Sequence, residues 1–375
     1  VTTFYSLSEV YTIYSALSAS TIFIAIDMIA NRGFKFSNLP SIIKMYIIFG
    51  INALITGLFV ASDYSHLLSS LITYFSFALV CFECWYITYR TGSMNWIFRT
   101  IKLVALLCSV YTIIWGVDYY NGIYVITMSS HNNPNTLGIV MVFGIFSLLY
   151  NLEKFNKNIV FNLFILIMFL YTTVLTGSRK SLIACIALIA FWLTIYIFDL
   201  KNQNNPLKSL IIVLLLMIGG FIVVYYLNNY FAETASFKRL LSLFSEGGSD
   251  TRKNLYALAF EYWKMSPVFG IGFNHYRLFS PVSTYSHSTY AEILSCTGII
   301  GTLIFFLPLI KQNFIIIKQL FNNFGKEKYL IKICLLMCII EFFLGFGQIF
   351  IYGFSHMLIL FCITWLPQER NVMKR

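Results

Sequence analysis

Long apolar segments recur along the whole chain and are separated by short polar stretches. Most of them run for about 17–22 residues, which is the length that a helix needs to cross the hydrocarbon core of a bilayer. In segments such as 159–176 and 208–227, apolar residues cover every side of a helix, whereas a helix on a soluble protein keeps a polar face. The pattern predicts an all-α polytopic membrane protein and excludes a soluble domain and a transmembrane barrel.

The same pattern predicts eleven membrane-spanning helices and one large polar insertion. Residues 1–229 hold the first eight helices, residues 230–288 form the large loop, and residues 289–375 hold the last three helices and a polar tail. The expected spans are 8–30, 45–61, 67–88, 102–118, 135–150, 159–176, 181–198, 208–229, 289–310, 332–349 and 351–366.

The basic residues predict the orientation of these helices. Of the 26 Lys and Arg, about 18 lie in every second loop or in the C-terminal tail, and the other 8 lie in the alternate loops. Basic residues favour the cytoplasmic side, so we expect the tail inside and the 230–288 loop outside. An odd number of spans places Val1 outside, and we expect a twelfth span before it. Topology therefore explains the net charge of +11, which does not indicate nucleic-acid binding.

Cysteines and histidines narrow the candidate chemistry. All eight cysteines lie in apolar segments and no paired CxxC pattern is present, so the sequence predicts neither a zinc site nor disulfides. All histidines are expected on the external side, which is where we expect any chemistry. They are His66, His131, His275, His287 and His356.

The external loop contains one predicted amphipathic helix, "SDTRKNLYALAFEYWKM", over about 251–265, with Ser249 or Asp250 as the N-cap. Arg252 falls on its apolar side, where an arginine directed away from water needs an anionic partner. That partner is an acidic side chain or a bound pyrophosphate, because planar guanidinium groups suit phosphate oxygens. The acidic candidates are Glu233, Glu246 and Asp250. The other residues expected on the apolar side are Leu255, Tyr256, Ala259, Phe260 and Trp263.

Arg179 breaks the charge rule, because it lies in "TGSRKS", a tight turn between two spans on the external side. It either anchors the turn by extending to the membrane interface or offers its guanidinium to an anionic ligand at the outer surface. Lys180 is expected to flank the turn without a further role.

His287 lies in "TYSHSTYAEILSCTGIIG", just ahead of the ninth span. Thr289 and Glu292 fit a capping box, which places His287 two residues before the helix, near its positive end. That field favours the neutral imidazole that a general base needs, whereas the alternative is an interface histidine bonded to water or to a tyrosine. The same box gives Glu292 a supporting role. Gly298 and Gly301 fit close helix packing.

Other residues allow two interpretations. The segment "SSHNNPNTLG" either lines a sugar site or supplies turn and cap residues, namely His131, Asn132, Asn133 and Asn135. The aromatic residues near the loop either stack on sugars or form an interfacial belt, which we favour for most of Trp263, Tyr276, Tyr285 and Tyr290. A proton-coupled transporter would use the few intramembrane carboxylates, Asp27, Glu83 and Glu341.

Three segments, in this order, resemble the signatures of the O-antigen polymerase and O-antigen ligase superfamily. They are "TGSRKSLIA", "SDTRKNLYALAFEYWKMSPVFGIGFNHY" and "YSHSTYAEILSCTGIIG", which lie within about 176–301. The resemblance implies a GT-C-like membrane fold of about twelve helices with one large external loop. The "SHS" around His287 departs from the "HN" more often found in such proteins.

The resemblance further implies a metal-independent, inverting glycosyltransferase of the bacterial inner membrane that needs no cofactor. Arg179 and Arg252 would bind the pyrophosphate of an undecaprenyl-linked glycan donor, and His287 would act on the acceptor hydroxyl. Expected partners are the lipid-linked donor and acceptor, the bilayer and a chain-length regulator protein. Further expected glycan or supporting contacts are Glu292, Tyr285, Tyr290, His131 and Asn135.

Polymerase and ligase share these motifs. A polymerase moves the growing chain onto the next lipid-linked repeat unit, whereas a ligase moves the finished chain onto lipid A-core. The third segment is more similar to O-antigen and capsule polymerases. A lipid-linked sugar transporter is the third interpretation, but its charges would line a central path instead of gathering in one outer loop.

Overall fold

A computed structural model of the chain describes residues 7–31, 38–115, 117–120, 123–126, 134–151, 157–202, 250–322 and 325–373. These residues are almost entirely helical, which confirms the predicted all-α membrane architecture. One short antiparallel hairpin joins β1 (Val117–Tyr120) to β2 (Ile123–Ile126). The chain divides into two compact units. Unit 1 consists of Val1–Asn95 and Ser249–Arg375, and unit 2 of Trp96–Gly248.

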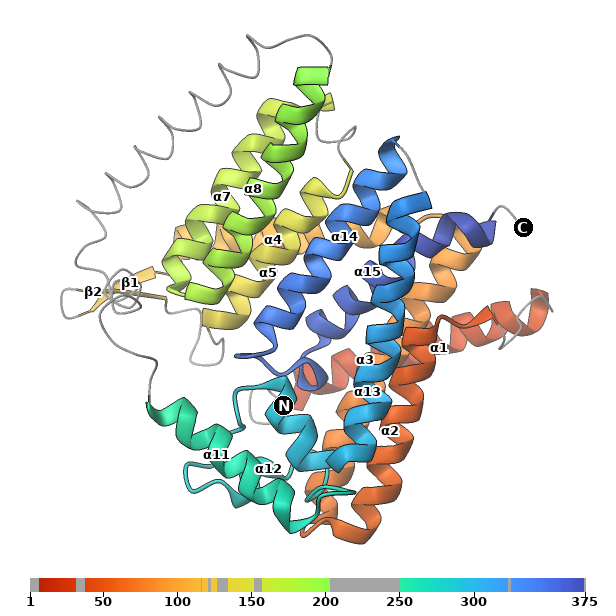
Figure 1. Cartoon of the computed structure of the whole chain (residues 1–375), viewed down its shortest axis with the longest axis vertical. Coiled ribbons are helices and arrows are strands. Elements are labelled where there is room, and N and C mark those ends of the chain that lie inside the picture. Colours follow the sequence, from red (N-terminus) through yellow and green to blue (C-terminus); the bar gives the residue numbers. More distant parts are fainter. Residues whose placement is uncertain are drawn as a thin grey trace. The chain divides into compact units, whose positions relative to one another are not determined.

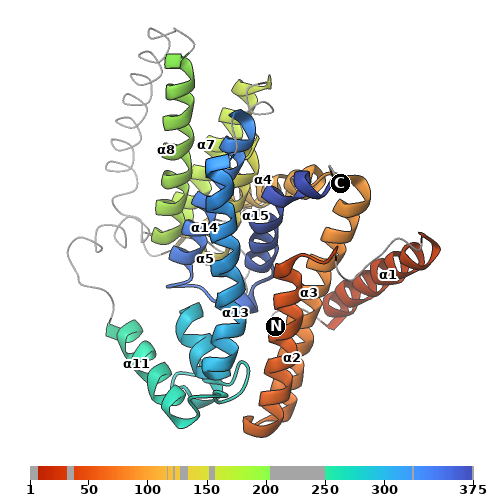
Figure 2. The same ribbon diagram turned by 45° about the vertical axis from the view of Figure 1, so that its right-hand side comes forward.

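Unit 1 is a bundle in which α2 packs against α3 and α13, and α14 packs against α13 and α15 (Figure 1). The short helix α11 lies beside the first part of α13 in both views (Figure 2). The bounds are α1 (Leu7–Asn31), α2 (Ser41–Val60), α3 (Tyr64–Thr91), α11 (Asp250–Met265), α12 (Tyr276–Phe279), α13 (Thr289–Asn322), α14 (Gly325–Leu344), the 3-10 turn η2 (Phe350–Tyr352) and α15 (Phe354–Met373).

Unit 2 contains α4, α5, α7 and α8, and α5 packs against both α7 and α8. Small residues allow this packing: a Cβ atom on Gly138 would meet the Ser181 side chain of α8 at 2.7 Å, and one on Gly144 would meet the Phe169 side chain of α7 at 2.9 Å. The bounds are α4 (Asn95–Trp115), α5 (Pro134–Leu149), α7 (Ile159–Thr176) and α8 (Arg179–Asn202).

The predicted spans correspond closely to described helices, except that the eighth, 208–229, lies outside the described residues. Of the helices described, five are long and apolar enough to cross a membrane, namely α2, α3, α4, α7 and α13. Parts of α1, α5 and α15 are shorter apolar helices. Large apolar side chains cover outward faces, for example Phe59 at 83% exposure. Such a surface is suited to lipid and not to water.

The three intramembrane carboxylates each contact a different neighbour within unit 1. Glu83 of α3 accepts hydrogen bonds from two hydroxyl groups of α1, at 2.7 and 2.9 Å. Asp27 pairs with Arg90 at 3.2 Å, and Glu341 pairs with buried His356 at 2.9 Å. These contacts join helices in pairs, which is a structural use for each carboxylate.

Candidate active site

The helix α13 is broken near its start, at Gly298 (φ 63°, ψ −166°). The loop that follows α11 enters the break and pairs with it through the backbone. Ile271 N–H donates to Ser295 C=O at 2.9 Å, and Ile299 N–H donates to Pro267 C=O at 2.9 Å. The groups that lost their helical partners at the break are therefore satisfied by the loop, as irregular backbone at membrane depth requires.

Two glycines make this joint. Gly298 and Gly270 both have positive φ, and a Cβ atom on either would overlap backbone atoms of the other segment. The prediction that Gly298 serves helix packing is therefore wrong. Gly298 instead permits the break in α13 and the close approach of the loop that follows α11. A Cβ atom on Gly301 would lie 3.3 Å from Asn52 of α2, consistent with the close approach predicted there.

The amphipathic helix α11 rests on the start of α13. Leu255 and Ala259 are buried in a cluster with Tyr276 and Cys296. Burying a leucine contributes about 2 kcal/mol. The buried stripe is rotated from the predicted one, since Phe260 is 48% exposed. The Tyr276 hydroxyl donates to Leu255 C=O at 2.7 Å, which ties α11 to α12.

Arg252 lies in the first turn of α11 and is exposed. It does not point into the protein, because the packing against α13 begins one turn later, with Leu255. A direction away from water and toward the membrane stays a prediction. Glu233 and Glu246, which could pair with it, lie outside the described residues, and so does the predicted N-cap Ser249.

The segment before α13 holds His287 in an unusual backbone conformation. Its φ is 58°, in the left-handed region that residues with a Cβ atom seldom adopt. Ser286 and Ser288 on either side are buried, and the Ser286 hydroxyl donates to Ser288 C=O at 3.0 Å. The His287 ring is half-buried and lies 4.5 Å from the Tyr285 ring, measured between centroids.

The predicted capping box is wrong in its partners. Ser288, not Thr289, caps α13, because its C=O accepts from Glu292 N–H at 2.9 Å and its hydroxyl accepts from Ala291 N–H at 3.5 Å. The Thr289 hydroxyl instead donates to Gln348 C=O at 2.6 Å, in the connection between α14 and α15. Because this connection packs against the start of α13, the Thr289 hydroxyl bonds to it and does not cap the helix.

Glu292 is fully buried and bonds to the residue before His287. Its carboxylate accepts from Ser286 N–H at 2.8 Å and from the Tyr352 hydroxyl at 3.1 Å. It therefore supports the His287 segment directly, more closely than a capping box would. Tyr352 comes from η2, so two parts of the chain that lie 60 residues apart meet at Glu292.

Arg277 is a residue of this site that the sequence analysis missed. Its guanidinium carbon lies 5.8 Å from the ring centroids of both Tyr285 and Tyr352, a cation–π geometry. Its Nε atom is buried and has no hydrogen-bond acceptor among the described residues. Its position in a basic, aromatic "HYRLF" stretch was the available signal, but only the fold brings it next to Tyr285 and Tyr352. Arg277 and His287 thus both neighbour the Tyr285 ring, and a half-buried guanidinium in this position can bind an anionic ligand.

The two tyrosines predicted as glycan or supporting contacts lie in different surroundings. Tyr285 lies between Arg277 and His287 and belongs to the site. Tyr290 packs among aromatic rings of unit 1, and its hydroxyl donates to Phe342 C=O of α14 at 2.7 Å. Tyr290 is therefore placed as a packing residue.

His275 joins the loop to the turn between α2 and α3. Its Nδ1 lies 2.9 Å from Phe273 C=O, and its Nε2 lies 3.2 Å from Asp63 N–H. The same Nε2 lies 3.1 Å from Asp63 C=O. A neutral ring with Nδ1 donating and Nε2 accepting satisfies the contacts with Phe273 C=O and Asp63 N–H. Burial lowers the pKa of His275 below its ordinary value. The hydrogen bond from His66 N–H lowers the pKa of Asp63.

The remaining predicted residues belong to unit 2 or lie outside the described ranges. Arg179 is the first residue of α8, half-buried, and follows a turn in which Gly177 (φ 62°) caps α7. Asn135, exposed in the first turn of α5, lies at the same end of unit 2, since Gly138 of α5 contacts Ser181 of α8. His131 lies outside the described residues.

Among the described residues, no three His, Cys, Asp or Glu side chains lie close enough together to hold a metal ion. The groups that the site does offer are an imidazole, a guanidinium and tyrosine hydroxyls and rings. These groups can bind phosphate and sugar and can accept a proton.

Comparison with known families identifies the region that carries this site. Residues 163–306 match the O-antigen ligase family. The match covers α7, α8, α11, α12 and the start of α13, so it includes Arg179, Arg252, Arg277 and His287. It confirms the resemblance to the O-antigen ligase and polymerase superfamily. No match was found among curated proteins.

The family match supports glycosyltransferase chemistry of the O-antigen ligase or polymerase type on lipid-linked glycans in a membrane. The match does not distinguish a ligase from a polymerase.

Proposed function

We propose that the protein polymerises undecaprenyl-pyrophosphate-linked repeat units on the external face of the bacterial inner membrane. The observation that carries this proposal is the geometry of His287. Its ring is half-buried and flanked by Tyr285, while its backbone is held in a left-handed conformation by buried neighbours. Unusual backbone conformations that the surroundings maintain are concentrated at functional sites.

The proposed reaction is an inverting displacement. The acceptor hydroxyl oxygen attacks the anomeric carbon of the donor glycan, and the bond from that carbon to the pyrophosphate oxygen breaks. His287 takes the hydroxyl proton, and undecaprenyl pyrophosphate leaves with the electron pair. A positioned base contributes about 10²–10⁴-fold to such a step.

Guanidinium groups stabilise the charge that develops on the pyrophosphate, so its departure needs no acid or metal ion. We assign this role to Arg179 and Arg252 from the resemblance. Arg277 joins them as a third candidate, because it lies beside Tyr285 and forms no salt bridge with any carboxylate of the described residues. A chain-length regulator protein remains an expected partner.

A ligase is the second candidate function, because the matching family is described as O-antigen ligase. The polymerase is favoured because the third segment, "YSHSTYAEILSCTGIIG", is more similar to O-antigen and capsule polymerases. The two activities differ in the acceptor, so one assay separates them.

The test supplies purified protein in proteoliposomes with lipid-linked repeat units, with and without lipid A-core. A ladder of products supports the polymerase, and a single transfer that requires lipid A-core supports the ligase. Translocation of the lipid-linked sugar without a new glycosidic bond would contradict both. His287→Ala and Arg179→Ala should lower the rate by at least 100-fold, as expected for a base and a leaving-group contact.

The left-handed backbone of His287 provides a matched control. Glycine and asparagine adopt this conformation readily, so His287→Gly and His287→Asn should fold as well as the wild type. Loss of activity in these stable variants would assign the role to the imidazole. Retained activity would overturn the proposal. Arg277→Lys keeps the charge but loses the planar fork, and full activity in this variant would remove Arg277 from the pyrophosphate site.

A further inference from the structure

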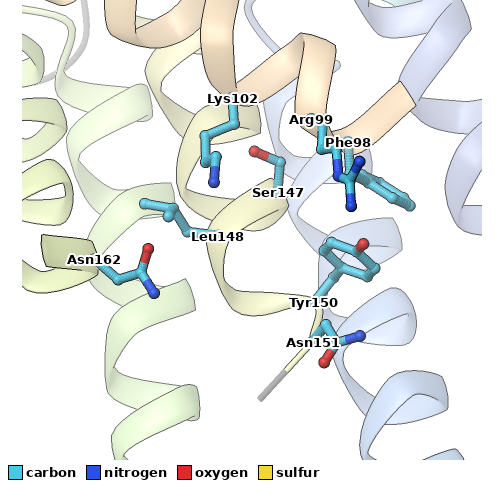
Figure 3. A pocket seen from close by; sticks show the side chains of 8 residues that line it. All are labelled: Phe98, Arg99, Lys102, Ser147, Leu148, Tyr150, Asn151 and Asn162. Carbon is cyan, nitrogen blue, oxygen red and sulfur yellow. The ribbon is translucent and has the colours of Figure 1, made fainter. Parts of the chain in front are cut away.

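We propose that unit 2 binds the phosphate headgroup of an anionic phospholipid at its cytoplasmic end, in a small pocket between α4, α5 and α7. Figure 3 shows the side chains that line it. The pocket is small and open, with a volume of about 430 Å³ including its mouth. It is lined by Phe98, Arg99, Lys102, Ser147, Leu148, Tyr150, Asn151 and Asn162.

The charge of the pocket favours an anion. Arg99 and Lys102 lie one turn apart on α4, and both extend from it toward the pocket (Figure 3). The C-terminal end of α5 and the N-terminal end of α7 meet here, and their partial charges, about half a unit each, have opposite signs and cancel. Arg99 and Lys102 are the charged groups among the described residues that line the pocket.

The polar groups and the wall suit a phosphate ester. Asn162, in the first turn of α7, is only 7% exposed, and Asn151 also lines the pocket, so the lining holds two amide groups besides the two cations. Tyr150 stacks on Phe98 with centroids 4.1 Å apart, which stiffens the wall next to Arg99. Phosphate oxygens accept charge-assisted bonds from such a set.

The surroundings identify the source of the phosphate as a lipid. Exposed apolar side chains begin directly beside the pocket, with Leu103 at 54% on α4 and Val160 at 79% on α7. The pocket thus lies at the boundary between charged and apolar surface, which is the depth of lipid headgroups. Basic pockets between helices on the cytoplasmic side are suited to anionic lipids.

This site is separate from the proposed chemistry. The pocket lies at the start of α7, whereas Arg179 follows the end of the same helix. The basic loops 89–102 and 151–158 assign the pocket to the cytoplasmic face.

The test measures the thermal unfolding midpoint of the detergent-purified full chain during titration with phosphatidylglycerol. Phosphatidylcholine with the same acyl chains and inorganic phosphate serve as the other probes. Only phosphatidylglycerol should raise the unfolding midpoint of the wild type. The double variant Arg99→Gln with Lys102→Gln should need an at least tenfold higher concentration of phosphatidylglycerol for half-maximal stabilisation. Equal stabilisation by phosphatidylcholine, or by inorganic phosphate, would overturn the assignment to an anionic lipid.

Two double variants make the test specific. Lys311→Gln with Lys318→Gln removes the same charge from exposed positions on α13, outside the pocket, and should bind as the wild type does. Arg99→Lys with Lys102→Arg keeps both charges and should also retain binding. Equal loss in the α13 variant and the pocket variant would show a diffuse charge effect and contradict the site. The single variants Arg99→Gln and Lys102→Gln should each show part of the loss.

Discussion

At the scale of single residues, His287 is stabilised by its neighbours in a conformation that is unfavourable by itself. A left-handed backbone costs a residue with a Cβ atom about 1–2 kcal/mol. The bond from Ser286 N–H to Glu292, at 2.8 Å, offsets that cost directly before His287, and Ser288 caps the helix directly after it. The orientation of the imidazole thus depends on a buried carboxylate that does not itself reach the surface.

Glu292→Gln should therefore destabilise the protein more than Tyr352→Phe. The amide replaces an accepting oxygen by a donor that faces Ser286 N–H or the Tyr352 hydroxyl, at a cost of about 2–3 kcal/mol, whereas the phenylalanine removes one bond worth about 1 kcal/mol. Chemical denaturation of both variants measures the difference. A Glu292→Gln variant as stable as the wild type would contradict an accepting carboxylate at this position.

His275 predicts a pH dependence of stability. Its folded pKa lies below the ordinary value of 6.5, because burial disfavours the imidazolium. The unfolded chain therefore binds a proton that the folded chain does not, so stability is complete above pH 6.5 and falls as the pH drops below it toward the folded pKa. Asp63, whose pKa is lowered from 3.8, adds a loss only at more acidic pH.

Unfolding free energies measured between pH 7.5 and 5 should show this decline. A His275→Gln variant cannot titrate and should be less stable at pH 7.5 but flatter over the same range. His66 lies 5.6 Å from the His275 ring, so a His66→Gln variant serves as the control for the neighbouring imidazole. An equal slope in the His275→Gln variant would assign the pH dependence to other groups.

At the scale of elements, the joint between the loop and α13 sets the geometry of the site. The start of this helix was predicted at the correct residue, because the change from polar to apolar residues marks it. The break at Gly298 was not predicted, since apolar residues continue on both sides and glycine is tolerated in membrane helices. Only pairing with a loop about 30 residues earlier makes the break favourable, and periodicity does not report such pairing.

Gly298→Ala and Gly270→Ala should each destabilise unit 1 by more than about 2 kcal/mol. Each adds a Cβ atom that overlaps backbone of the other segment, and each residue has a positive φ. Gly353→Ala is the control, because its φ is −126° and its nearest new contact is the His356 side chain at 3.3 Å. Thermal unfolding of the three variants tests this order. Equal midpoints for all three would contradict a joint built on close backbone approach.

At the scale of the whole molecule, the sequence predicted the type and the position of the described helices better than the composition of the site. Apolar length is a local property, so the spans could be assigned one by one. Which arginine belongs to the site depends on contacts between different segments. Arg277 contacts the rings of Tyr285 and Tyr352. The exposed position of Arg252 depends on where α11 meets α13. The residues of the site are therefore brought together by the fold, whereas the number of predicted spans follows from the local composition of the sequence.

The span count makes a prediction about the two faces of the membrane. The helices α4, α5, α7 and α8 lie between Thr100 and the loop, and four crossings alone would return the chain to the face on which it began. Val282 reaches the opposite face only when the predicted span 208–229 also crosses. Val282→Cys should thus react with a membrane-impermeant maleimide in intact spheroplasts, and Thr100→Cys only after permeabilisation. Both positions are exposed, and seven of the eight natural cysteines are buried and one partly buried, so the wild type should label weakly. Labelling of both variants from the same side would contradict the eighth span and, with it, an external location for His287.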